Sequence, residues 1–362
     1  MESIYYVLCW HCHRRCKHCY EDRFHPYVRE DLESVVREAE INAPRIVANL
    51  PDTMQYLDRT QLDDSTPSGF SISTGRIIIS GGDVLTEPVR ERVLYPTLDA
   101  IRDKYRDAGG VKVIVQTTGD LLTPKIVQEL LDRGVWSISA AGMDDYHVGM
   151  QDNGKKLLAD KLTAMFEAAG MVNAAEHEAR RQLGKDSPPV YSMFGATEDA
   201  WIGKLWPRGR AWSNGLSNAT KADNFCNAWS GGLGFLEAGY EGSEVSIDPS
   251  GDVYPCCIKT AEPLGNLTDE PLLDILSSLA GEPALEAINA GKPERMGLTH
   301  GWSVEDFMDA SETKTPQGER YANLCIGCDA FHRNVLGGIL RTRRQKRQAG
   351  RMGLLTTTEL AG

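Results

Sequence analysis

The chain has 362 residues, a formal net charge of −12 and a hydrophobic fraction of 41%. This length is sufficient for one large domain and a smaller one, and the acidic balance argues against nonspecific nucleic-acid binding, which needs a basic surface. No apolar run approaches the roughly 18 residues that a membrane helix needs, and no signal segment precedes the first strand pattern. We therefore expect a cytoplasmic protein without membrane contact.

Nine cysteines are present, which is an odd number in a chain without an export signal. Disulfides are uncommon under those conditions, so metal ligation is the better interpretation. The cysteines fall into two groups, one near the N-terminus and one in the C-terminal half.

The first group follows a short buried strand that we predict at residues 4–8. Cys12, Cys16 and Cys19 have the spacing Cys-x3-Cys-x2-Cys. Three thiolates on one tight loop suit a [4Fe–4S] cluster, whose fourth iron would then lack a protein ligand and be open to chemistry. The alternative is a zinc knuckle completed by a neighbouring histidine. The histidines within reach are His11, His13 and His18.

Helix and strand patterns alternate after this loop. Apolar spacing predicts a helix at 29–50, and the polar, turn-rich stretch at 51–75 predicts an inserted loop or short helix. A compact strand at 76–80 then ends in the Gly-Gly-Asp triplet of residues 81–83. Glycines let a backbone come close to a ligand, so this turn is a candidate binding element.

The pattern continues at a regular pitch to residue 194. The expected elements are a helix at 94–105, a strand at 111–116, a helix at 124–134, a strand at 136–140, helices at 157–169 and 176–183, and a strand at 190–194. Such alternation predicts parallel βα units whose post-strand loops form the working face. A sixth strand cannot be placed, and the Ser/Asn-rich stretch that ends at residue 220 marks a domain boundary.

Four polar side chains on and after the fourth strand are candidate site residues. Ser137 and Ser139 share one face of the strand, where they either reach a ligand or are packed hydroxyls. Asp144 and His147 follow the strand at the predicted mouth and are candidates for substrate contact or proton transfer. A solvated polar loop is the alternative for this second pair.

A β-hairpin at 244–254 and a helix at 271–279 accompany the second group of cysteines. The group consists of Cys226, Cys256, Cys257, Cys325 and Cys328. Adjacent residues on a strand point to opposite faces, so Cys256 and Cys257 do not easily serve one site. Four of these thiols would hold an iron–sulfur cluster, with a structural zinc as the alternative.

The N-terminal motif resembles the signature of radical S-adenosylmethionine (SAM) enzymes, in which this cysteine loop follows the first barrel strand. The Gly-Gly-Asp turn resembles the family's Gly-Gly-Glu, with Asp83 replacing the glutamate, and Thr117-Thr118-Gly119 resembles its Thr-Asn-Gly. The resemblance implies that Cys12, Cys16 and Cys19 carry the catalytic cluster. It also implies the contacts to SAM. These are Tyr20, Gly81, Gly82, Asp83, Thr117, Ser137, Ser139 and Arg210, with Arg208 as a second candidate arginine.

The C-terminal motif resembles the SPASM/Twitch extension of the same enzymes, with Gly251-x4-Cys256 followed by Cys325-x2-Cys328. Too few cysteines remain for the full pattern, so the resemblance implies one auxiliary [4Fe–4S] cluster. Its expected ligands are Cys226, Cys256, Cys325 and Cys328. The implied fold is α/β, a partial (β/α)6 TIM-like barrel at 1–215 with a smaller α+β auxiliary domain at 216–335 and a basic tail at 336–362.

The resemblance implies reductive cleavage of SAM to a 5′-deoxyadenosyl radical that abstracts hydrogen, with the auxiliary cluster taking up the substrate electron. Transfer of an aminocarboxypropyl group from SAM is one alternative, and a non-catalytic iron–sulfur or zinc regulator is another. The substrate would be a small metabolite or a peptide. No winged-helix leader-binding domain fits before residue 4, which favours the metabolite.

A flavodoxin or ferredoxin is the expected electron donor. The positive run of Arg341, Arg343, Arg344, Lys346 and Arg347 is a hypothetical docking segment for it. The alternative is an ordinary solvated helix end.

Overall fold

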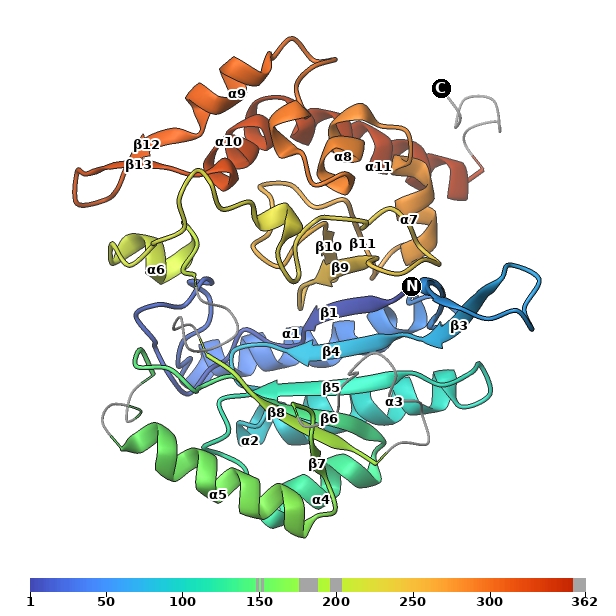
Figure 1. The fold of residues 1–362 in the computed structure, drawn as a ribbon, viewed down its shortest axis with the longest axis vertical. Coiled ribbons are helices and arrows are strands. Elements are labelled where there is room, and N and C mark those ends of the chain that lie inside the picture. The colour runs from blue at the N-terminus through green and yellow to red at the C-terminus, as the bar shows by residue number, and fades with distance from the viewer. Residues whose placement is uncertain (148–149, 151–152, 176–187, 196–203, 354–362) are drawn as a thin grey trace.

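A nine-stranded, mostly parallel sheet organises the computed structural model, which describes residues 1–147, 150, 153–175, 188–195 and 204–353. The strand order is β11-β10-β9-β1-β4-β5-β6-β8-β7. The C-terminal part, yellow to red in Figure 1, lies beside the N-terminal part, and strands β1 and β9 meet at their junction.

Five strands pair in parallel in the order in which they occur along the chain. They are β1 (Ser3–Val7), β4 (Arg76–Ser80), β5 (Lys112–Thr117), β6 (Val135–Ala140) and β8 (Val190–Met193), with the short β7 (Val172–Asn173) at the edge. The predicted α/β class with a partial parallel barrel is confirmed. The part of the chain that the structure describes contains five of the six barrel strands expected.

Helices follow these strands and cover the outer face of the sheet, with α1 and α3 behind it in Figure 1. Their bounds are α1 (Arg29–Ala48), α2 (Glu87–Val89), the π-helical η1 (Arg90–Leu94), α3 (Tyr95–Tyr105), α4 (Pro124–Asp132) and α5 (Gly154–Ala168). The short α6 (Gly209–Ser213) lies apart from this layer and contacts the loop after β1. The Thr123 hydroxyl caps α4 by accepting from the Ile126 amide, as Thr before a proline at the first position favours. The helix predicted at 176–183 lies outside the described residues.

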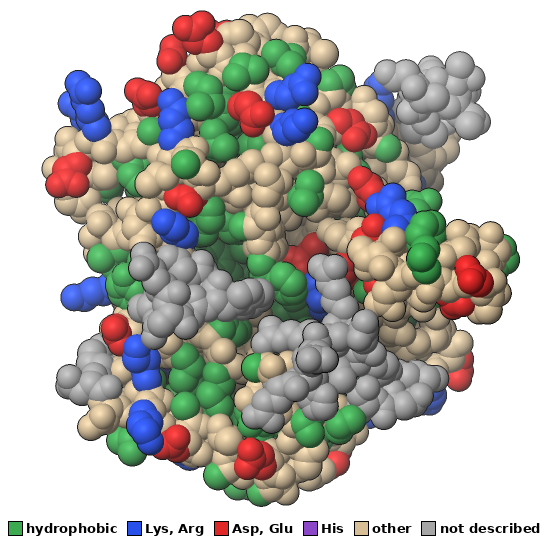
Figure 2. Space-filling model, in the orientation of Figure 1, with side chains coloured by type: hydrophobic (Ala, Val, Ile, Leu, Met, Phe, Trp, Pro, Cys, Tyr) green, Lys and Arg blue, Asp and Glu red, His purple; other side chains and the backbone are tan. Residues whose placement is uncertain are grey.

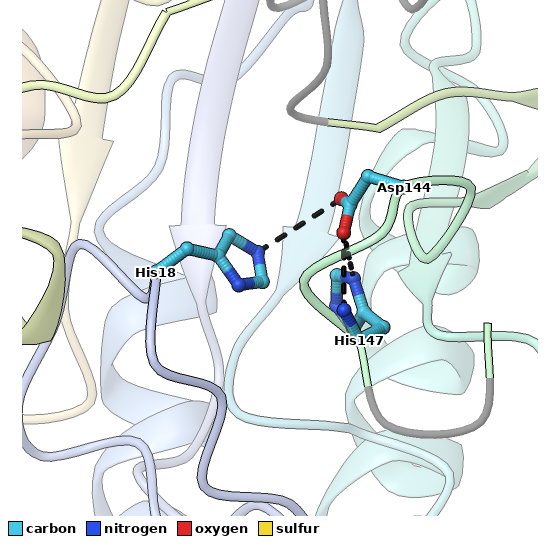
Figure 3. Close-up of side chains that lie close together, drawn as sticks. All are labelled: His18, Asp144 and His147. Atoms are coloured by element: carbon cyan, nitrogen blue, oxygen red, sulfur yellow. Dashed lines mark hydrogen bonds and ion pairs between the residues drawn. The ribbon is translucent and has the colours of Figure 1, made fainter. Parts of the chain in front are cut away.

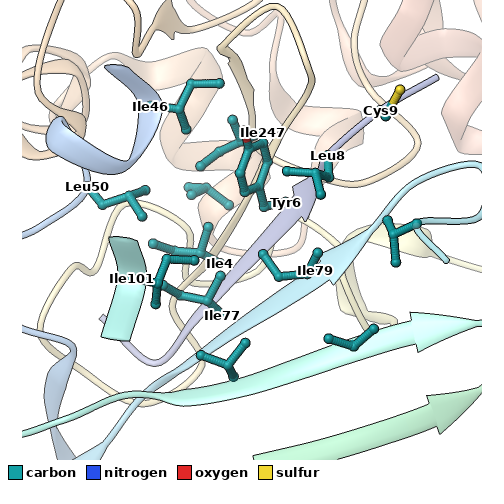
Figure 4. Close-up of a cluster of buried hydrophobic side chains, with 14 of the residues drawn as sticks. Ile4, Tyr6, Leu8, Cys9, Ile46, Leu50, Ile77, Ile79, Ile101 and Ile247 are labelled. Atoms are coloured by element: carbon teal, nitrogen blue, oxygen red, sulfur yellow. The ribbon is translucent and has the colours of Figure 1, made fainter. Parts of the chain in front are cut away.

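Alternation along β1 separates two buried environments. Ile4, Tyr6 and Leu8 join the main core between sheet and helices, where Figure 4 shows them against side chains of α1, β4 and β9. Tyr5 and Val7 point to the opposite face and join a second cluster inside the barrel. The period of two in a strand therefore gives the barrel an interior distinct from its helix-packed exterior.

The stretch at 51–75 is not the loop or short helix that its turn residues predict. It forms an antiparallel hairpin of β2 (Gln55–Leu62) and β3 (Phe70–Thr74). Pro67 to Gly69 forms only the turn, and Gly69 adopts a φ of 73° there. The flanking segments are rich in β-branched and aromatic residues, which favour a strand over a helix.

The hairpin predicted at 244–254 in the C-terminal part is confirmed. Strand β9 (Glu244–Ile247) pairs in parallel with β1, so the hairpin extends the barrel sheet across the expected domain boundary. Its antiparallel partner β10 (Asp252–Tyr254) pairs next with β11 (Gly265–Asn266).

Several short helices and one small hairpin complete the C-terminal part. They are 3-10 η2 (Phe225–Asn227), α7 (Leu272–Leu279), α8 (Pro283–Asn289), 3-10 η3 (Pro293–Arg295), α9 (Val304–Ala310), β12 (Glu312–Lys314), β13 (Arg320–Ala322), α10 (Leu324–Phe331), π-helical η4 (His332–Leu336) and α11 (Gly337–Arg351). Among the described helices, none combines the length and apolar character needed to cross a membrane.

Candidate functional site

The N-terminal cysteine loop leaves the carboxyl end of β1, where the working face of a parallel barrel lies. Cys12 and Cys16 are buried, Cys19 is half-buried, and all three are free thiols. Burial raises the pKa of Cys12 to about 12 and that of Cys19 to about 11. These thiols therefore stay protonated at neutral pH unless a metal replaces the proton.

The Gly-Gly-Asp turn packs directly against this loop. The Gly82 amide donates to the Cys9 carbonyl at 3.1 Å, and the Asp83 amide donates to the His11 carbonyl at 3.1 Å. A Cβ on Gly82 would overlap the His11 carbonyl oxygen and lie 2.7 Å from the Cys12 Cβ. Glycine is thus required here by close approach of the cysteine loop.

Asp83 does not have the free carboxylate that a SAM ammonium would need. Its side chain is buried and accepts hydrogen bonds from the Thr117 hydroxyl at 3.1 Å, the Thr118 hydroxyl at 2.7 Å and the Leu85 amide at 3.0 Å. The expected SAM contacts Asp83 and Thr117 instead bind each other. Their polar groups join the ends of β4 and β5 because both side chains are buried where those strands end.

Arg210 also differs from its expected role. Its guanidinium donates to four backbone carbonyls of the cysteine loop, those of Cys16 (2.8 Å), Glu21 (3.4 Å), Asp22 (3.0 Å) and Phe24 (2.6 Å). With these donors engaged, Arg210 positions the loop and offers no fork for a SAM carboxylate.

The residue before Arg210 contacts the same loop. Gly209 has a φ of 54°, and a Cβ there would lie 2.7 Å from the Cys19 carbonyl oxygen. The Ala211 amide donates to that carbonyl at 3.1 Å. Arg208 extends the other way and donates to the Cys325 carbonyl at 3.2 Å. We call residues 208–210 the linking segment, because it contacts both cysteine groups.

The structure brings together the four thiols predicted for the auxiliary cluster. Cys226, Cys256, Cys325 and Cys328 are free and interact electrostatically with one another, and burial raises the pKa of each thiol. The nearby charge of Arg208 opposes this rise at Cys256, Cys325 and Cys328. Four mutually close thiols without disulfides form a donor set suited to a metal.

Cys257 belongs to a different environment. It packs in the barrel-interior cluster with Tyr5 and Tyr20 rather than with the four auxiliary thiols. Burial raises the pKa of its thiol, with the neighbouring Cys256 as the next cause. The geometry therefore selects Cys256 from the adjacent pair.

Tyr20 and the two serines face the barrel interior. The Tyr20 hydroxyl lies 3.4 Å from the Tyr5 hydroxyl, which also bonds the Ser80 hydroxyl at 2.8 Å. Ser139 shares a hydrogen bond of 2.8 Å with Ser192 on β8 and lines the same interior as Ser137. These hydroxyls therefore line part of an otherwise largely apolar barrel interior.

Figure 3 shows His18 of the cysteine loop facing Asp144 and His147, which follow β6. His147 Nδ1 lies 2.8 Å from the Asp144 carboxylate, and His18 Nε2 lies 3.9 Å from it. Asp144 is 1% exposed, and burial lowers the pKa of His18 to about 4. The predicted pair at the mouth is thus a buried Asp–His dyad in contact with the cysteine loop.

Asp120 is a site residue for which the sequence reasoning had no signal. Its carboxylate accepts from Arg14 at 2.7 Å and lies 2.9 Å from His13 Nε2, and the Thr118 hydroxyl also donates to it. These partners hold the pKa of Asp120 well below its usual range although burial alone would raise it. Asp120 therefore fastens the cysteine loop to the end of β5.

Residues 239–329 match the family model for SPASM, an iron–sulfur cluster-binding domain. This chain carries a SPASM domain. The extension predicted from Gly251-x4-Cys256 and Cys325-x2-Cys328 is thereby confirmed, and iron–sulfur binding with it. No curated protein sequence matches the chain.

Among solved structures, the chain resembles BtrN in complex with AdoMet and 2-DOIA, at 13% identity and a TM-score of 0.41, covering 80% of this chain and 88% of BtrN. It also resembles native anSMEcpe with bound AdoMet and Cp18Cys peptide, at 13% identity and a TM-score of 0.40, covering 94% of this chain and 98% of anSMEcpe. A third similar structure is SuiB of Streptococcus suis bound to S-adenosylmethionine, at 12% identity and a TM-score of 0.36, covering 80% of this chain and 67% of SuiB.

Two asparagines that the sequence reasoning missed orient cysteines of the SPASM domain and of the segment before it. The Asn224 side chain accepts from the Cys226 amide at 3.0 Å, and the Asn323 side chain accepts from the Cys325 amide at 2.9 Å. Asn323 also donates to the Thr220 carbonyl at 2.7 Å, which ties the two cysteines together. Both cysteines occur in an Asn-x-Cys sequence. This repeated pattern could have indicated the contacts, because an Asn side chain often accepts from the amide two residues later.

The basic run lies on helix α11, which packs against the SPASM domain. Arg347 is buried and forms an ion pair of 2.7 Å with Glu270, and Arg343 pairs with Glu282 at 2.8 Å. Three more arginines of the same helix pair within the chain. These pairs are Arg341–Glu262, Arg344–Asp269 and Arg351–Asp274.

The buried pair with Glu270 contradicts the interpretation of Arg347 as part of a solvated helix end. The other pairs engage most arginines of the run, so few of its positive charges are unpaired and available to dock an electron donor. The face in Figure 2 likewise shows Lys and Arg side chains among Asp and Glu side chains rather than in one basic field.

Proposed function

We propose that this protein is a radical SAM enzyme with one auxiliary cluster in its SPASM domain. The observation that carries the proposal is the convergence of two free-cysteine groups on the linking segment. Arg210 holds the loop of Cys12, Cys16 and Cys19, and Arg208 contacts the backbone of Cys325. Two cysteine groups that share one positioning segment fit a pair of neighbouring clusters better than they fit a single structural zinc site.

The residues fit the groups that the proposal requires. Cys12, Cys16 and Cys19 would hold a [4Fe–4S] cluster with one open iron, and Cys226, Cys256, Cys325 and Cys328 would hold a second, fully ligated one. All seven cysteines are free of disulfides; Cys12 and Cys16 are buried, and the other five are half-buried. When bound, the first cluster supplies the electron for reductive cleavage of SAM, and the 5′-deoxyadenosyl radical then abstracts hydrogen from the substrate.

The chain's own residues would position SAM and substrate in the barrel interior. Tyr20, Ser137 and Ser139 face that interior and are the proposed SAM contacts among the residues predicted from the sequence. The Asp144–His147 dyad is placed to accept a proton as the substrate is oxidised, since the two side chains bond at 2.8 Å beside the cysteine loop. The auxiliary cluster would accept the substrate electron, and a flavodoxin or ferredoxin would supply the first one.

The test is to reconstitute the protein anaerobically and to add dithionite and SAM. Release of 5′-deoxyadenosine and methionine is expected, and the Cys12→Ala/Cys16→Ala/Cys19→Ala variant should release neither. Methylthioadenosine as the sole product would instead indicate aminocarboxypropyl transfer. Intact SAM together with two assembled clusters would indicate a regulator, and the enzymatic proposal would fail.

A further inference from the structure

A cavity of about 230 Å³ occupies the barrel interior. Its walls come from the interior faces of successive strands, with Arg76 and Ile78 on β4, Lys112 and Gln116 on β5, and Ser139 on β6. The cavity therefore spans the length of the strands, from their amino ends, where Arg76 and Lys112 lie, toward the carboxyl ends.

Among the described residues the Lys112 ammonium makes no hydrogen bond or close ion pair, and the carboxylate that acts on it electrostatically is Glu2, which also lines the cavity. The side chain is only 8% exposed, and its ammonium lies over the Trp136 ring, 5.2 Å away. No carboxylate or carbonyl of the described chain accepts a hydrogen bond from it. Its Nζ is open to the cavity rather than enclosed by protein, so an anion bound there would accept a hydrogen bond from it.

Arg76 adds a second positive charge to the same end. Its guanidinium lies over the Trp229 ring at 4.4 Å and pairs with Glu2 at 3.4 Å. Glu2 is already shared, because its carboxylate also accepts from the Gly242 amide at 2.5 Å. Burial lowers the pKa of Lys112, and the charge of Arg76 lowers it further while that of Glu2 opposes the change. The amino end of the cavity thus has two cations and one engaged carboxylate.

At the opposite end of the cavity, the wall residue Gln116 is connected to the cysteine loop through the Tyr5 hydroxyl. Gln116 accepts from the Tyr5 hydroxyl at 3.3 Å, and that hydroxyl lies 3.4 Å from the Tyr20 hydroxyl of the loop. A molecule whose charged end contacts Lys112 would therefore present its other end toward the loop that holds Cys19.

We propose that the cavity binds the substrate, and that the substrate is a small anionic molecule whose carboxylate or phosphate group is held by Lys112 and Arg76. The rings of Trp136 and Trp229 flank that group and accommodate an apolar body. The volume lies below the roughly 300–1,000 Å³ typical of drug-sized ligands, which favours a small acid over an extended peptide. The statement that this ligand is the substrate rests on the proposed function. The statement that the cavity binds an anion does not depend on it.

Calorimetric titration of the full-length chain tests the proposal with three probes of similar shape: benzoate, phenyl phosphate and the neutral benzamide. At least one of the two anions should bind at least tenfold more tightly than benzamide, and the tighter of the two identifies the anionic group. Lys112→Met should weaken anion binding at least tenfold. Lys125 lies on α4 with a side chain that is 83% exposed. Lys125→Met should therefore leave anion binding unchanged.

Equal binding of all three probes, no binding of either anion, or unchanged binding by Lys112→Met would overturn the proposal. If Lys112→Met does not fold, reductive methylation of the unaltered chain gives the answer by peptide mass spectrometry. The anion that binds more tightly should slow methylation of Lys112 and not of Lys125, and a Lys112 rate that neither anion changes would overturn the proposal. Both measurements omit SAM, so loss of anion binding and absence of SAM cleavage are separate failures.

Discussion

Arg210 Nε donates to the carbonyl oxygen of Cys16 at 2.8 Å, so the arginine expected to bind a cofactor carboxylate instead fastens the loop that would hold the first cluster. Hydrogen bonds from a charged donor are worth roughly 1.5–3 kcal/mol each. We expect Arg210→Met to lose the N-terminal cluster, or about four of about eight irons after anaerobic reconstitution. Iron analysis and iron–sulfur absorbance measure this.

Arg15 provides the matched control for that variant. It lies on the same loop but is exposed. Arg15→Met should keep the full iron content. If Arg210→Met also keeps it, the carbonyl contacts do not position the loop, and Arg210 is available for another role.

Gly82 offers a second test of loop packing. A methyl group there would overlap the His11 carbonyl, and overpacking of this kind costs about 1–3 kcal/mol. We expect Gly82→Ala to lower both the free energy of unfolding and the iron held by the N-terminal loop. Gly338→Ala is the control because a Cβ at Gly338 meets no atom within 4 Å. Equal urea midpoints for the two variants would contradict the packing argument.

The adjacent cysteines of the SPASM domain separate in a third experiment. Cys256 lies with the other auxiliary thiols, and Cys257 lies against Tyr5 and Tyr20. Cys256→Ala should lose about four irons, and Cys257→Ala should retain about eight. The reverse result would assign the ligand to Cys257.

The sequence predicted the strands well because buried parallel strands are short apolar runs bounded by turns, as in residues 76–80. It also identified the cysteines that meet in space, since metal ligands have characteristic spacings. The roles of Asp83 and Arg210 could not be predicted in the same way. A motif shows which side chains lie near a site, but their hydrogen-bond partners depend on tertiary contacts such as Asp83 with Thr117 and Thr118.

Arg347 in the C-terminal helix is a further residue whose contacts could not be predicted from the sequence. Within a run of basic residues nothing distinguishes it, yet it is buried against Glu270, whose side chain is 1% exposed. Removing one partner of a buried ion pair costs about 3–5 kcal/mol, because the other charge remains without compensation. Arg347→Met should lower the free energy of unfolding by that amount in urea titrations.

Lys346 is the neighbouring control for this variant, and Lys346→Met should have little effect. The double variant Arg347→Met/Glu270→Leu should recover part of the loss, because no unpaired charge remains. If the single variant is as stable as the parent, the pair contributes nothing. Truncation after Gly338 removes Arg347 as well, so it would test folding of the SPASM domain before it tests docking of an electron donor.

Asp248, at the turn of the hairpin that leads to Cys256, provides a pH-dependent test. Burial raises the pKa of this carboxyl from 3.8 to about 6, and the charges of Lys259 and Arg23 only partly oppose the rise. The folded chain therefore keeps the proton to a higher pH than the unfolded chain. The contribution of Asp248 to stability therefore falls as the pH rises from 3.8 to about 6, by at most roughly 3 kcal/mol.

Asp248→Asn removes this titration while preserving the acceptor oxygen for the amides of Ser250 and Asp252, which donate to it at 3.0 and 3.2 Å. We expect the variant to match the parent near pH 4 and to be more stable than the parent at pH 7. Urea unfolding of the chain without metal, measured at each pH unit from 4 to 8, follows the difference. A stability difference that does not change between pH 4 and pH 7 would show that the carboxyl titrates near its usual value in the folded chain.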